Sequence, residues 1–185
     1  MPEVDIVPYI LPAVVAGVAV FIASFLIWMV IKWHDRDISP LPDEPAFLDG
    51  LKAAKVPPGF YMWPMGENRE VKSDAFKARW SAGPWGNMVV LPTAPNFARN
   101  LISTLIVYIL ISWAAAVVIS PGIGESPTYW HVFWPASLVA GAVYCLGPMP
   151  GSFFFGKASR FMLTDFIDGL IFAAVTAGVL AALWP

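Results

Sequence analysis

Long apolar runs alternate with polar segments along this chain, and they predict four membrane-spanning helices. The runs cover residues 9–33, 101–120, 130–147 and 164–184. A helix rises about 1.5 Å per residue, so about 20 residues cross a hydrocarbon layer of about 30 Å. The first, second and fourth runs are long enough, whereas the third is short and is expected to end at the Pro/Gly-rich run 147–151. We therefore expect an all-α integral membrane protein.

The first apolar run is expected to remain in the membrane rather than to be cleaved as a signal peptide. The residues before it carry Glu3 and Asp5, where a signal peptide has positive charge. Lys32 follows the run instead of preceding it, and the run is longer than the apolar core of a signal peptide. We therefore expect a retained helix.

Composition supports a membrane protein and excludes several other classes. Of the 185 residues, 58% are hydrophobic and 13% are charged, whereas about 25% of a soluble domain is charged. Cys145 is the single cysteine, which excludes an intramolecular disulfide and a multi-cysteine metal site. The net charge of −2 argues against nucleic acid as a partner.

Basic residues are confined to two regions of the chain. Of the 11 lysines and arginines, nine lie between positions 32 and 99, and Lys157 and Arg160 lie between the third and fourth runs. Loops rich in Lys and Arg stay on the cytoplasmic side of a membrane. We therefore expect a cytoplasmic segment 34–99 and both termini outside.

The sequence divides into an N-terminal helix (1–33), a cytoplasmic segment (34–100) and a three-helix bundle (101–185). The middle segment is rich in aromatic residues, which disordered linkers lack. Its charges balance, so bulk charge does not predict binding to anionic lipid. We expect short helices at 43–55 and 73–83, capped by Asp43 and by Ser73 or Asp74, and strands at 59–64 and 87–92 that can pair.

Three stretches resemble a family of small uncharacterised bacterial membrane proteins. They are "DGLIFAAVTAGVLAALWP" at the C-terminus, "PPGFYMWP" and "GPWGNMVVLP". In that family a long first helix precedes a Pro/Gly-rich cytoplasmic segment and a helical bundle. The resemblance implies a bacterial inner membrane and the same order of parts, and it implies no reaction.

Small residues recur every four positions in the last apolar run. In lipid, such a pattern lets helix backbones approach closely. The stripe serves either packing within the chain's own bundle or docking to another subunit. The candidate contact residues are Gly169, Ala173, Ala177, Gly178 and Ala181.

Two acids, Asp165 and Asp168, lie at the start of the same run. With Thr164 or Asp165 as the cap, Asp168 falls in the first helical turn, where the helix dipole favours negative charge. The alternative is a proton or cation entry point, because acids within a membrane are usually functional. We expect the first interpretation, in which the interfacial acids start the helix and hold the preceding loop.

The remaining polar residues predict no metal, no cofactor and no catalytic site. His34 has Asp35 and Asp37 beside it, but neighbouring residues on a helix do not point together. His131 is expected on the opposite membrane face, and no known phosphate-binding, nucleophile or zinc motif is present.

These observations favour a non-catalytic accessory or scaffold subunit of a bacterial inner-membrane complex. Its partners would be the lipid bilayer and other membrane subunits, reached through small-residue helix faces and the cytoplasmic segment. A small oligomeric transporter or channel is the alternative, although mid-membrane polar residues are few. A third hypothesis is an interfacial enzyme acting on lipid or quinone through Asp168, His34 or Tyr61.

Overall fold

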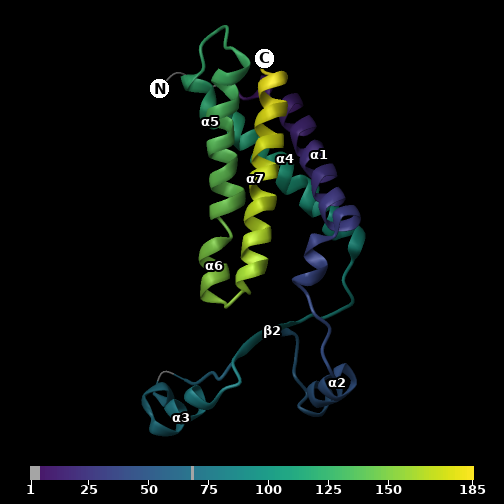
Figure 1. Cartoon of the computed structure of the whole chain (residues 1–185), viewed down its shortest axis with the longest axis vertical. Coiled ribbons are helices and arrows are strands. Elements are labelled where there is room, and N and C mark those ends of the chain that lie inside the picture. Colours follow the sequence, from purple (N-terminus) through teal and green to yellow (C-terminus); the bar gives the residue numbers. More distant parts are fainter. Residues whose placement is uncertain (1–4, 68) are drawn as a thin grey trace. The chain divides into compact units, whose positions relative to one another are not determined.

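The computed structural model describes residues 5–67 and 69–185, and in this part of the chain it is mostly helical with one two-stranded sheet (Figure 1). Four helical stretches are long and apolar enough to cross a membrane. The expected multi-pass helical protein is thus confirmed. The stretches are Val7–Ile31, Phe97–Gly122, Tyr129–Phe154 and Ser159–Ala182.

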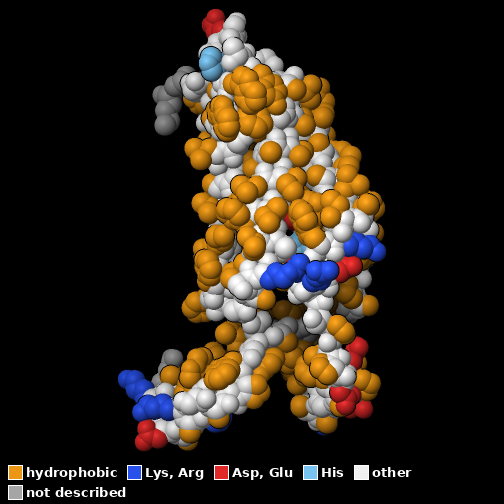
Figure 2. Space-filling model, in the orientation of Figure 1, with side chains coloured by type: hydrophobic (Ala, Val, Ile, Leu, Met, Phe, Trp, Pro, Cys, Tyr) orange, Lys and Arg blue, Asp and Glu red, His pale blue; other side chains and the backbone are white. Residues whose placement is uncertain are grey.

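The chain forms two compact units, and the first of them is the helical bundle. This bundle combines the residues up to Ser39 with Phe97–Pro185, so the first span belongs to the same unit as the other three. Figure 2 shows that hydrophobic side chains cover its visible face, as contact with lipid tails requires. The second unit is Pro40–Asn96.

Small residues allow the bundle helices to approach closely. The helices are α1 (Ile10–Phe25), α4 (Phe97–Ile119), α5 (Tyr129–Gly141) and α7 (Ser159–Ala182). An all-apolar core, in which five of the eight residues are alanine, joins them. Its members are Ala16, Ala115, Ala116, Ile119, Val132, Ala136, Ala177 and Leu180.

The small-residue stripe of α7 packs largely within the chain itself. Ala173 and Ala177 are buried in the bundle. Gly169 faces the backbone of Tyr144, and a Cβ at this glycine would lie 3.0 Å from the Tyr144 carbonyl oxygen. The close backbone approach predicted from the sequence therefore takes place between α7 and the helical turn that follows α5.

Each of two spans contains a π-helical turn. Leu26–Ile31 (η2) follows α1 directly, and Lys32 then adopts a left-handed conformation with φ of 57°. A short 3-10 helix, Trp33–Arg36 (η3), comes next. The second π-helical turn, Ala142–Leu146 (η6), follows α5. Widened turns of this kind are frequent at functional sites.

The third span does not end where the sequence predicted. Helix α6 (Met149–Phe154) begins directly after Pro148, so helical structure extends through the Pro/Gly-rich run. Pro150 lies in the first turn of α6, where a missing N–H leaves no hydrogen bond unmade. The predicted end at 147–151 is therefore confirmed for the helix, which ends at Leu146, but was wrong for the apolar span, which α6 extends to Phe154.

Helix α7 begins earlier than predicted, at Ser159. Gly156, with a positive φ of 68°, follows α6, and no glycine or proline lies between it and Thr164. The residue at the N-cap position is Ala158, whose side chain makes no cap hydrogen bond. Asp168 therefore lies more than two turns inside the helix, and the prediction that the two acids start it was wrong.

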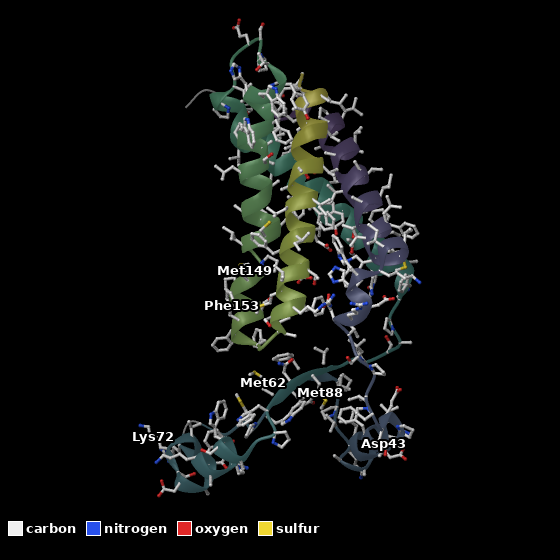
Figure 3. The ribbon with its side chains drawn as sticks, in the orientation of Figure 1. Asp43, Met62, Lys72, Met88, Met149 and Phe153 are labelled. Carbon is white, nitrogen blue, oxygen red and sulfur yellow. The ribbon has the colours of Figure 1, made fainter. Side chains whose placement is uncertain are left out.

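The second unit contains the short elements that the sequence predicted. Helix α2 (Glu44–Ala53) is capped by Asp43, whose carboxylate accepts a hydrogen bond from the Ala46 N–H at 3.0 Å. Helix α3 (Asp74–Ala82) is capped by Ser73. These two caps are confirmed. Figure 3 marks Asp43 at the start of α2. Short 3-10 helices complete the chain at Val7–Tyr9, Glu70–Lys72 and Ser120–Gly122.

Strands β1 (Gly59–Trp63) and β2 (Gly86–Val90) pair, as predicted, and the pairing is antiparallel. Phe60 lies opposite Val89, and Tyr61 lies opposite Met88. We call this pair of strands the ribbon; Met62 and Met88 mark its two strands in Figure 3.

Candidate functional site

The imidazole ring of His34 lies between two carboxylates. Its Nδ1 is 2.9 Å from Asp37 Oδ2, and its Nε2 is 3.0 Å from Asp168 Oδ2. The side chains of His34, Asp37 and Asp168 are 2%, 0% and 7% exposed. Three ionisable groups are therefore buried in direct contact, and they join the end of the first span to α7.

Local backbone geometry explains why His34 and Asp37 meet. The left-handed Lys32 ends the π-helical turn, and the chain continues as a 3-10 helix. Side chains three positions apart lie above one another in a 3-10 helix. The expectation that the acids beside His34 would not point toward it was therefore wrong for Asp37, because it treated Asp37 as an adjacent residue although the two are three positions apart.

One face of α7 supplies the other half of the site. Arg160, Thr164 and Asp168 follow one another at intervals of four residues and so share a face. The Thr164 hydroxyl donates to Asp37 Oδ2 at 2.7 Å, and Arg160 forms an ion pair with Asp37 Oδ1. Arg160 also donates to the Trp33 carbonyl oxygen at 3.2 Å. We call Trp33, His34, Asp37, Arg160, Thr164 and Asp168 the histidine cluster.

Aromatic rings enclose the histidine cluster. The Trp28 ring stacks on His34 with a centroid distance of 4.1 Å and an angle of 7°. The Trp33 indole N–H donates to Asp168 Oδ1 at 3.2 Å, so both oxygens of Asp168 are engaged. Phe161 lies against the ring of His34 at 5.7 Å. These rings exclude water, which strengthens the electrostatic interactions between the ionisable groups.

Asp37 is held in its charged form. Burial alone would raise its pKa, but hydrogen bonds from Thr164 and His34 and the positive charge of Arg160 lower the pKa below its ordinary value of 3.8. Hydrogen bonds and opposite charges favour the ionised carboxylate. Asp37 therefore acts as a fixed negative charge beside Nδ1 of His34.

Asp165 has a different environment from Asp168. It forms an ion pair with Lys157, and the two side chains are 29% and 30% exposed. The Lys157 ammonium lies 3.8 Å from the centre of the Phe161 ring. Asp165 thus belongs to the surface near the start of α7, whereas Asp168 belongs to its interior.

Hydroxyl groups continue the polar region beyond Asp168. Tyr108 lies within the electrostatic reach of Asp168, and its hydroxyl donates to Ser24 Oγ at 3.3 Å. Among the described residues, the buried hydroxyls of Tyr144 and Thr176 have no hydrogen-bond partner. The polar groups thus extend into the bundle, toward the apolar core around Ala177.

The ribbon is a second unusual feature, because both of its faces are mostly apolar; Asn87, opposite Met62, is the polar exception. Side chains alternate between the faces of a strand. Phe60, Met62 and Val89 therefore lie on one face, and Tyr61, Trp63, Met88 and Val90 lie on the other. Phe60 and Val89 are 51% and 62% exposed.

The other predicted polar residues do not join the histidine cluster. His131 forms a capping box with Thr128 at the start of α5. The Tyr61 hydroxyl, in the second unit, donates to the Pro57 carbonyl oxygen at 2.7 Å. Within residues 5–67 and 69–185, no three His, Cys, Asp or Glu side chains are arranged to hold a metal ion.

Sequence reasoning singled out His34 and Asp168 but missed their contact. It also missed the roles of Trp33, Arg160 and Thr164. The spacing of four between positions 160, 164 and 168 was a usable signal, since it places an Arg, a Thr and an Asp on one helix face. No signal in the sequence indicated that this face meets the 3-10 helix after the first span.

Comparison with other proteins suggests no function for the histidine cluster or the ribbon. No family model, curated protein or solved structure matches the chain. What the protein does must therefore be argued from the histidine cluster and the ribbon themselves.

Proposed function

We propose that the chain is a non-catalytic accessory or scaffold subunit of a bacterial inner-membrane complex, and that it docks through the ribbon. The observation that carries this proposal is the pair of apolar ribbon faces. Because the small residues of α7 pack largely inside the bundle, the ribbon, which exposes Phe60 and Val89, is the better candidate for a docking surface.

The ribbon lacks what an isolated sheet needs. Two-stranded sheets are marginally stable alone in water, and a stable sheet normally packs one apolar face on a core. Within the described part of the second unit, Phe76 is the one buried hydrophobic side chain. Segment 40–96 therefore gains stability when another surface covers the ribbon.

The unpaired strand edges of the ribbon favour another protein as the surface that covers it. Each strand has one partner strand in the described sheet, so one edge of each strand presents backbone donors and acceptors. A strand from another subunit can pair with such an edge while its side chains cover the apolar faces. Hydrocarbon cannot form these hydrogen bonds.

The proposed orientation places the ribbon on the cytoplasmic side. The basic residues cluster between positions 32 and 99 and at Lys157 and Arg160, and such loops remain in the cytoplasm. On the visible face of the bundle, Lys and Arg side chains gather at one end (Figure 2). The inner membrane of a bacterium is implied by the family resemblance of the closing helix.

Charges placed on the ribbon should release the protein from its complex. We expect the wild type, extracted in mild detergent, to run in a discrete complex on blue-native electrophoresis. The double variant Phe60→Asp, Val89→Asp should reach the membrane at normal levels but run as a free protein. Burying an unpaired aspartate in an interface costs more free energy than the contact returns.

A matched control uses the same segment. Asp49→Ser changes an exposed residue of α2 and should leave the complex intact. A wild type that runs alone, or a ribbon double variant that keeps the complex, would contradict the proposed function.

A further inference from the structure

The two contacts of His34 determine how many protons the histidine cluster holds, and docking through the ribbon does not depend on those protons. Each of the two contacts of His34 joins a nitrogen to a carboxylate oxygen, so each needs one proton between the two atoms. Because Arg160 and Thr164 hold Asp37 as a carboxylate, two arrangements satisfy both contacts. Either a charged imidazolium donates to both carboxylates, or a neutral imidazole donates to Asp37 and accepts from a protonated Asp168.

These two arrangements differ only in the position of one proton. In the first, the N–H bond at Nε2 of His34 is intact; in the second, that bond is broken and an O–H bond exists at Oδ2 of Asp168. The transfer spans 3.0 Å, which is within the range for direct proton transfer. The charges of Arg160, Asp37, His34 and Asp168 sum to zero in both arrangements.

Asp37 and Asp168 differ in a way that gives the transfer a direction. Asp37 is fixed as a carboxylate by Arg160, Thr164 and His34. Among the residues that the structure describes, His34 is the one cationic partner of Asp168, and its other partner is the neutral Trp33 indole. Asp165, on the same helix, is occupied by Lys157. The mobile proton therefore lies on the Asp168 side of the ring.

We propose that His34 and Asp168 share a proton and form a proton-transfer site at the inner end of the bundle. Nδ1 of His34 keeps its proton and its hydrogen bond to Asp37, while Nε2 can hold the mobile proton or release it to Asp168. Arg160, which is 47% exposed, marks the side open to solvent.

The surroundings indicate where a proton can go after it reaches Asp168. Tyr108 and Ser24 come next, followed by the buried hydroxyls of Tyr144 and Thr176. Thr176 lies eight residues beyond Asp168 on α7, or about 12 Å further along the helix. Beyond it, the core around Ala177 and Leu180 is apolar. The polar route therefore enters from the inner side and ends within the bundle.

Ionisable groups buried within a membrane protein usually serve transport or proton transfer. A buried ion pair contributes little net stability compared with apolar residues of similar size, so stability alone does not account for this one. The proton-transfer site goes beyond docking, and it is the chemistry expected of the small transporters or channels that the sequence left as an alternative.

Solid-state ¹⁵N NMR of histidine-labelled protein in lipid bilayers tests the shared proton. We expect the Nδ1 signal of His34 at the protonated position. The Nε2 signal should lie between the protonated and unprotonated positions and should move with temperature, since the proton divides its time between nitrogen and oxygen. His131 supplies an internal reference in the same spectrum.

Two neighbouring acids provide the variants. Asp168→Asn replaces the carboxylate with an amide that cannot take up the proton, so the Nε2 signal should move to one extreme and lose its temperature dependence. Asp165→Asn, one turn earlier on α7, should leave both signals unchanged. The proposal is overturned by a wild-type Nε2 signal fixed at either extreme, or by an Asp168→Asn spectrum that matches the wild type. The ribbon and its complex are not involved in either result.

Discussion

Replacing His34 with leucine should lower the free energy of unfolding by about 3–5 kcal/mol, the usual cost of removing one partner of a buried ion pair. The substitution leaves Asp168 buried with the Trp33 indole as its remaining hydrogen-bond donor. Asp37 is less affected, because Arg160 and Thr164 still bind it. Unfolding of the detergent-solubilised protein by increasing amounts of SDS measures the change.

Two further variants make this experiment specific. His131→Leu, at an exposed capping position, should cost no more than about 1 kcal/mol. The double variant His34→Leu, Asp168→Leu should recover most of the stability lost in His34→Leu, because it removes both partners of the pair. A single variant as stable as His131→Leu, or a double variant less stable than His34→Leu, would contradict the contact between His34 and Asp168.

Substitution of Gly17 by alanine should destabilise the bundle by about 1–3 kcal/mol, the usual cost of overpacking. A Cβ at this position would lie 2.5 Å from Ile109 Cγ1 and 2.6 Å from the Ile109 Cα and backbone nitrogen. Backbone atoms cannot rotate away as the end of a side chain can. Helices α1 and α4 must therefore move apart, which loses contacts along their interface.

Gly141 provides the matched control for Gly17. It also lies in a helix of the bundle, but a Cβ there would meet only the Cβ of Ala173, at 3.8 Å, which is an ordinary contact. Gly141→Ala should therefore be neutral or slightly stabilising, since alanine is the better helix former. Equal losses for Gly17→Ala and Gly141→Ala in the SDS unfolding experiment would show that the α1–α4 contact is not as close as described.

The membrane architecture followed from the sequence because it depends on local properties. Length and apolarity of a run determine whether a helix can cross a membrane, and neither depends on the other helices. The caps at Asp43 and Ser73 were predictable for the same reason, because a cap joins residues three positions apart. The pairing of β1 with β2 followed from two short apolar runs between turn residues.

Helix boundaries were less predictable wherever the local signal was ambiguous. Proline and glycine at 147–151 normally end a helix, but Pro150 occupies the first turn of a new one. Thr164 and Asp165 resemble helix caps, yet α7 begins at Ser159 because no helix-breaking residue follows Gly156. This shift moved Asp168 from the predicted first turn to the interior of the helix.

The sequence by itself determined the four apolar spans and the short elements of the middle segment. It also determined that the small residues of the last span form a surface for close helix packing. The tertiary structure alone decided that His34 meets Asp168, because these residues are 134 positions apart and belong to different spans. Nothing local favours that contact. It forms because close packing of the helices brings the 3-10 turn after Lys32 against one face of α7, where burial leaves each ionisable group dependent on the others for its hydrogen bonds.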